Sequence, residues 1–159
     1  MRILTLDIGI DTGCAVLESP TTLGTAGNSG QLMPSILHTR TIHRTDLSEA
    51  LQHLEKEFGP YDQVFFEEPI PQRGKLGDDL RKAILACRYM YPGATNIAPG
   101  QWKSYLYIAR MNLPLHVDAT QHEKDATRLG IYCFQMPGIV GLREYRAEEK
   151  KPVSAKGNC

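Results

Sequence analysis

The 159-residue sequence lacks several features that would place it in a special class of protein. No apolar run approaches the roughly 20 residues of a membrane-spanning helix, so we expect no membrane partner. The N-terminus has Arg2 followed by a short strand-like run that contains Asp7, which is unlike a signal peptide. The four cysteines show neither CxxC pairing nor the spacing of zinc ligands, which indicates reduced thiols and a cytoplasmic location.

An excess of one charge is also missing, because 18 Lys and Arg residues balance 18 Asp and Glu residues. Proteins that bind nucleic acid are usually basic, so this balance counts mildly against a nucleic-acid partner. If several acids are clustered on a metal, however, basic residues can dominate elsewhere. The length and the 42% hydrophobic content suit one globular domain. We expect this domain at residues 1–142, followed by a charged C-terminal tail at 143–159.

The apolar pattern predicts an α/β fold. Five segments have the pattern of strands: residues 2–8, 13–18, 36–43, 63–67 and 95–98. Four segments have the pattern of helices: residues 47–58, 78–90, 99 to about 109, and 121–134. Asp46 and Glu49 have the spacing of a capping box at the start of the first helix. A three-strand antiparallel meander followed by two crossover strands predicts a five-stranded mixed sheet with helices on both faces.

Acidic side chains end two of these strands, and a His–Asp pair lies on the last helix. Asp7 closes the first strand, and Glu67 closes the fourth. His122 and Asp125 are three residues apart, so they share one helical face. Oxygen ligands of this kind suit Mg²⁺ or Mn²⁺, the ions used for phosphodiester cleavage. The sequence therefore predicts a two-ion site with these four residues as ligands and catalytic groups.

Two assignments at this site stay open. Glu68 competes with Glu67, although a side chain at position 68 would point to the opposite face of the strand. A carboxylate inside a buried strand is costly without a partner, which favours a functional role for Glu67. His122 can either bind metal or orient the attacking water. We expect Glu123 to face solvent.

The motifs that carry these residues resemble a known family. Asp7-Ile8-Gly9 with Thr12-Gly13 is similar to the first-strand motif of the ribonuclease H-like superfamily, and specifically of RuvC Holliday-junction resolvases. In that family an acid closes the first strand and a glutamate closes the fourth. A final helix supplies His or Asp, followed three residues later by Asp-Ala, which is the pattern of residues 122–126 here.

This resemblance covers roughly residues 1–133 in element order. It implies a ribonuclease H-like fold and a metal-dependent endonuclease that cuts branched DNA by two-metal in-line hydrolysis. The implied substrate is the four-way Holliday junction, and the implied assembly is a homodimer. Helix 78–90 occupies the position that builds this dimer in the family, although its apolar stripe is equally consistent with core packing.

Basic residues near the expected site are candidates for nucleic-acid binding. Arg73 and Lys75 follow Glu67 in a loop that contains glycine, where phosphate contact and simple solvation are equally plausible. Lys103 resembles the lysine that RuvC proteins carry after the fifth strand. For Trp102 we favour packing over stacking on a base.

The sequence also departs from the family, and other functions compete. RuvC proteins have a further basic helix before the metal-binding helix, whereas residues 111–121 are too few for one here. A RuvC-like nuclease that acts on RNA or on other branched DNA is therefore an alternative. The Asp-x-Gly-x-x-Thr-Gly pattern also resembles the phosphate-binding hairpin of actin-like and sugar-kinase ATPases, but those proteins need two such domains. A non-catalytic nucleic-acid-binding module is a third alternative, which the intact ligand set argues against.

Overall fold

The computed structural model describes residues 1–19, 33–67, 77–105, 108 and 110–136. Five strands form one mixed sheet in the order β3-β2-β1-β4-β5. Strand β1 lies at its centre, antiparallel to β2 and parallel to β4. The strands are β1 (Arg2–Asp7), β2 (Asp11–Glu18), β3 (Ser35–His43), β4 (Gln63–Glu67) and β5 (Thr95–Asn96). The expected α/β class, with a three-strand meander and two crossover strands, is confirmed.

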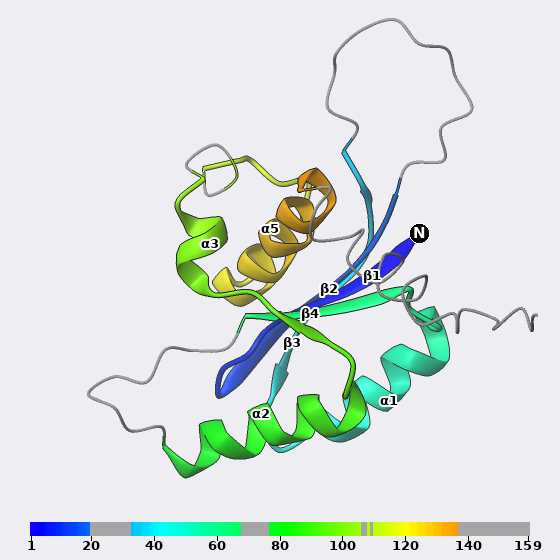
Figure 1. The fold of residues 1–159 in the computed structure, drawn as a ribbon, viewed down its shortest axis with the longest axis vertical. Helices are drawn as coiled ribbons and strands as arrows, with labels where there is room; N and C mark the ends of the chain where they lie inside the picture. The colour runs from blue at the N-terminus through cyan, green and yellow to red at the C-terminus, as the bar shows by residue number, and fades with distance from the viewer. Residues whose placement is uncertain (20–32, 68–76, 106–107, 109, 137–159) are drawn as a thin grey trace, which may run out of the picture.

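Helices cover both faces of this sheet (Figure 1). They are α1 (Leu47–Phe58), α2 (Asp78–Met90), α3 (Pro99–Lys103) and α5 (Gln121–Gln135). The first two pack on one face and the last two on the other (Figure 1). No helix in the described residues is long and apolar enough to cross a membrane.

Residues of β1 alternate between two hydrophobic cores, as the pleat of a strand requires. Leu4, Leu6 and Ile8 pack with α1 and α2, in a cluster that also contains buried Phe66 of β4. Ile3 packs on the opposite face with α5, in a cluster that contains Phe65. Every residue of β1 or β4 is therefore assigned to one face by its position in the strand.

One predicted cap and several predicted element bounds differ from the structure. The Asp46–Glu49 capping box is wrong: Asp46 makes no side-chain cap bond, because its Oδ1 accepts instead from the Thr45 hydroxyl at 3.1 Å. Helix α3 ends at Lys103, since the chain there turns with an N–H of Tyr105 bonded three residues back. Strand β5 is two residues long, although its pairing with β4 continues through the Ile97 N–H. The predicted tail falls outside the described residues.

Candidate metal and nuclease site

The carboxyl ends of β1 and β4 bring two carboxylates side by side. Asp7 and Glu67 are partners in the parallel register of these strands. Phe65, two residues before Glu67, lies in the core beneath α5. Thr5, two residues before Asp7, donates its hydroxyl to a backbone carbonyl of α5 at 2.7 Å. Because strand side chains alternate, Asp7 and Glu67 share the face that α5 covers.

Helix α5 brings His122 to Asp7. Thr120 caps the helix by accepting the N–H of Glu123 at 3.1 Å. His122 Nδ1 then lies 2.9 Å from Asp7 Oδ2. An ionised carboxylate can only accept a hydrogen bond, so with Asp7 ionised the proton is on Nδ1, and in a neutral ring Nε2 is then the acceptor.

Gly13 of β2 allows α5 to begin this close to the sheet. Gly13 pairs with Asp7 across the strands. A Cβ at position 13 would overlap the backbone carbonyl of His122, which is not a group that can swing aside. The Thr12-Gly13 motif therefore has a steric role at the site: it admits the turn of helix that carries His122.

Glu67 has two donors, and both come from α3. Lys103 Nζ lies 2.6 Å from Glu67 Oε1, and the indole N–H of Trp102 donates to Oε2. Glu67 is only 4% exposed and Trp102 only 1%. The expectation that Trp102 packs is confirmed, and the indole also orients a site carboxylate. No local sequence pattern indicates this bond, because positions 67 and 102 belong to different elements.

Asp125 completes the group from the next turn of α5. Its Oδ2 lies 4.0 Å from Lys103 Nζ. Its Oδ1 accepts from Gln121 Nε2 at 2.7 Å and from Arg128 Nη1 at 3.3 Å. Our reading of the sequence missed both donors, although their spacing of four and three residues from Asp125 is a usable signal in a helix.

The pKa values of Asp7 and Glu67 are both raised, by burial and by the charge of a neighbouring carboxylate. Burial raises the pKa of Asp7, and the nearby charge of Asp125 raises it further, while the bond and the charge of His122 oppose this. Burial also raises the pKa of Glu67, against the bond and charge of Lys103 and the bond of Trp102, and Asp7 adds to the rise. Carboxylates whose charge is disfavoured in this way gain stability from a cation placed among them.

The carboxylate oxygens of Asp7, Glu67 and Asp125 are chemically suited to bind a hard divalent cation, but they are not arranged around a common point. In the described part of the chain, no group of three or more His, Cys, Asp and Glu side chains has the arrangement of a metal centre. Instead, the Lys103 ammonium lies between Glu67 and Asp125, and His122 turns to Asp7. The ammonium shows that this place accepts a positive charge between oxygen ligands, which are the donors that Mg²⁺ and Mn²⁺ prefer.

The remaining sequence assignments fare differently. Arg73, Lys75 and Glu68 lie outside the described residues. The expectation that Glu123 faces solvent is wrong, because its carboxylate accepts from the hydroxyls of Thr39 and Thr41 at 3.3 and 3.1 Å. Those bonds fasten the first turn of α5 to β3. Glu123 therefore helps to hold the helix that carries His122 and Asp125.

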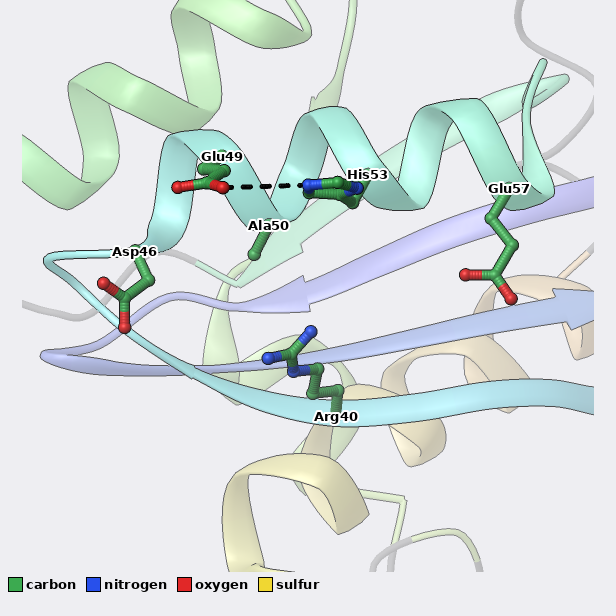
Figure 2. Close-up of a pocket in the computed structure, with 6 residues that line it drawn as sticks. All are labelled: Arg40, Asp46, Glu49, Ala50, His53 and Glu57. Carbon is green, nitrogen blue, oxygen red and sulfur yellow. Dashed lines mark ion pairs between the residues drawn. The ribbon is translucent and has the colours of Figure 1, made fainter.

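A groove of about 400 Å³ opens beside this site. Gln121, Lys124 and Arg128 of α5 form one wall, and the segment 111–117 forms the other. A larger pocket of about 500 Å³ lies between β3 and α1 (Figure 2). Apart from buried Ala50, that pocket is lined by exposed residues, among them the His53–Glu49 pair at 3.7 Å, and it contains none of the expected site residues. The groove along α5 adjoins the site only at Asp125, whose Oδ1 accepts from two of the groove's lining residues, Gln121 and Arg128, in the described structure.

Two solved structures are similar to this chain over nearly its whole length. Thermus thermophilus RuvC superposes with a TM-score of 0.62 at 15% identity, covering 91% of this chain and 97% of that one. T. thermophilus RuvC in complex with Holliday junction substrate gives 0.65 at 15% identity, covering 91% and 96%. The chain has the RuvC fold. Neither the models of protein families nor the curated protein sequences give a match to this sequence.

The RuvC fold confirms the ribonuclease H-like architecture expected from the sequence. A fowlpox virus Holliday junction resolvase is also similar, at 12% identity, 93% and 99% coverage and a TM-score of 0.39, which is too low to carry an argument.

Proposed function

We propose that this protein is a metal-dependent endonuclease that cuts phosphodiester bonds in branched DNA, with the four-way Holliday junction as its substrate. One observation carries the proposal: Asp7, Glu67 and Asp125 converge on the α5 side of a RuvC fold, with a cationic group lying between two of them. The convergence is costly in folding terms, since burial disfavours the charges of Asp7 and Glu67. A bound cation offsets that cost.

The carboxylates of Asp7, Glu67 and Asp125 would hold Mg²⁺ or Mn²⁺, in two ions by analogy with enzymes that displace phosphodiesters in line. Bound there, the ions would supply Lewis-acid stabilisation and a more acidic water. His122 keeps Nδ1 on Asp7, so its Nε2 is the nitrogen that can accept a proton from the attacking water or bind metal. Lys103 contributes a positive charge for the scissile phosphate.

The groove beside α5 gives the DNA strand a place to lie. Lys124 is half-buried along this wall and has no carboxylate within ion-pair distance among the residues that the structure describes. A phosphate flanking the cleaved bond would meet this ammonium, and backbone contacts of this kind position DNA without reading its sequence. The choice of branched DNA rests on the fold and on the similarity to a RuvC described as a complex with Holliday junction substrate.

Cleavage assays on a panel of substrates test the function. Wild type is incubated with labelled four-way junctions, flaps, duplex DNA and RNA–DNA hybrids, with and without Mg²⁺ or Mn²⁺. We expect metal-dependent nicking of junctions, and a loss of at least about 10²–10³-fold in Asp7→Asn. Asp11→Asn, an exposed carboxylate in the neighbouring hairpin, is the matched control. No cleavage of any substrate would reject the enzyme, and cleavage of RNA alone would reject the junction resolvase.

We also propose that two copies pair through α2. Leu85 and Tyr89 lie one helical turn apart and are 65% and 86% exposed, while Ala83, Ile84 and Cys87 fill the core. The helix thus has an apolar outer surface beyond what core packing needs. A homodimer would present two sites to the two symmetric strands of a junction.

Light scattering tests this pairing. Wild type is expected at the mass of a dimer, and Leu85→Asp at the mass of a monomer. Val117→Asp alters an apolar residue of the α5 groove that is even more exposed than Leu85, at 87%, and should remain dimeric. A wild-type monomer, with or without junction DNA, contradicts the pairing.

A further inference from the structure

The two oxygens of Asp125 have separate surroundings. Oδ1 accepts from Gln121 at 2.7 Å and from Arg128 at 3.3 Å. Oδ2 faces the other way, toward Lys103 Nζ at 4.0 Å and therefore toward the group that contains Glu67. One oxygen is thus engaged by protein donors, and the other is directed to the place where a cation fits.

Arg128 is itself held in place. Its Nη2 donates to the backbone carbonyl of Met111 at 3.4 Å, so the guanidinium links α5 to the segment before it. The side chains of Arg128 and Asp125 are only 16% and 17% exposed. Arg128 Nε is buried without a partner in the described structure. The guanidinium is therefore oriented so that its two terminal nitrogens bond Asp125 and Met111, while the Nε–H is left without a partner among the described residues.

We propose that Gln121 and Arg128 are positioning residues, which fix Asp125 so that it offers a single oxygen, Oδ2, to a divalent cation. This rests on the proposed metal site. The three residues lie at i−4, i and i+3 of α5, so one helical face contains both the ligand and its supports. Mg²⁺ demands near-ideal octahedral geometry, which a carboxylate fixed to present one oxygen suits.

Positioning and simple charge make opposite predictions. Arg128 is a cation, so its removal should strengthen metal binding if Coulomb attraction alone matters. If Arg128 positions Asp125, its removal should weaken metal binding, because the carboxylate then rotates and a supporting hydrogen bond is lost. Residues that orient metal ligands typically contribute 10–100-fold in affinity. The sign of the change separates the two explanations.

The experiment measures Mn²⁺ binding to the whole chain by electron paramagnetic resonance, without DNA. Arg128→Met and Gln121→Met remove the donors and keep side-chain volume. Arg110→Met and Gln52→Met make the same changes at exposed positions whose side chains form no hydrogen bond or ion pair with other described residues, and serve as controls. We expect dissociation constants raised about 10–100-fold in the first pair and unchanged in the controls. Asp125→Asn sets the loss expected when the ligand itself is altered.

The outcomes are distinguishable. If wild type does not bind Mn²⁺, the proposed metal site fails. If wild type binds and both Arg128→Met and Gln121→Met bind as tightly or more tightly, positioning is overturned while the metal site stands. If Arg128→Met does not fold, Gln121→Met decides alone, since Gln121 is exposed at the start of α5. Arg128→Lys should recover less than tenfold of the Mn²⁺ affinity that Arg128→Met loses. A lysine ammonium lacks the fork of donors with which the Arg128 guanidinium bonds both Asp125 and Met111.

Discussion

The two faces of the sheet are built from the same strands but to different ends. On the α1–α2 face, Leu4 and Leu6 of β1 are fully buried in a hydrophobic core. On the α5 face, alternate residues of the same strand are Ile3, Thr5 and Asp7, so the core gives way to polar groups toward the strand's end. One strand therefore contributes a closed apolar core on one side and two residues of the candidate site region, Thr5 and Asp7, on the other.

This contrast shows where the fold carries a cost. Buried Glu67 and nearly buried Asp7 lie on the α5 face, where burial disfavours their charges. On the α1–α2 face no described carboxylate residue is buried as a whole, although Glu55 of α1 has one buried oxygen beside Tyr61 and Tyr91. We expect mutations on the first face to alter metal binding and cleavage, and mutations on the second to alter stability alone.

The largest effect is expected on the apolar face. Leu51 of α1 is fully buried in that core, so Leu51→Ala leaves a cavity and should reduce the free energy of unfolding by about 2–5 kcal/mol. Urea unfolding followed by circular dichroism measures the loss. Mn²⁺ affinity of the folded variant should equal that of wild type. A large change in affinity would show that the two faces are not separable.

The next effect is expected where β2 meets α5. Gly13→Ala places a Cβ against the backbone of His122, so α5 must shift, at about 1–3 kcal/mol in stability. His122 moves with it, and cleavage should fall more than stability accounts for. Gly130→Ala is the control, because there the Cβ also crowds α5 but meets the side chain of Leu17 and not the backbone of His122. Equal cleavage by both variants contradicts the steric role of Gly13.

Sequence patterns predicted the strands and the faces of the site residues well. Alternation in β1 and β4 and the three-residue spacing in α5 were enough to place Asp7, Glu67, His122 and Asp125 on one side of the sheet. These are local periodicities that backbone geometry imposes on any such segment. The metal role of the four residues stays a prediction.

Sequence patterns did not predict the hydrogen-bond partners of side chains that can bond to more than one group. Asp46 has the composition of a cap but bonds Thr45, and Glu123 bonds β3 instead of facing solvent. The contacts of Glu67 with Trp102 and Lys103 join elements 35 and 36 residues apart, so no local pattern encodes them. Tertiary packing decides such bonds, and only the folded chain shows them.

A smaller effect is expected from the N-caps of α5 and α1, the helices that cover opposite faces of the sheet. Thr120 caps α5 through its side chain, whereas Asp46 does not cap α1. Thr120→Ala should lower stability by about 1 kcal/mol and loosen the turn that holds His122. Asp46→Ala should change stability by less than about 0.5 kcal/mol. Thermal unfolding of both variants measures the difference. Equal losses would contradict the assignment of the caps.

The smallest expected effect is a gain in stability, in contrast to the losses predicted above. The folded state raises the pKa of Asp7 through burial, so the ionised carboxylate disfavours folding when no metal is bound. The contribution of this group to stability is fully present at acidic pH, and it is lost as the pH rises through the raised pKa. Asp7→Asn should therefore raise the melting temperature of the metal-free protein at neutral pH. Below the unfolded pKa of Asp7 the advantage should vanish. An Asp7→Asn variant less stable than wild type at neutral pH, in the presence of a chelator, would mean that the His122 bond outweighs burial, and that the α5 face carries no such cost at Asp7.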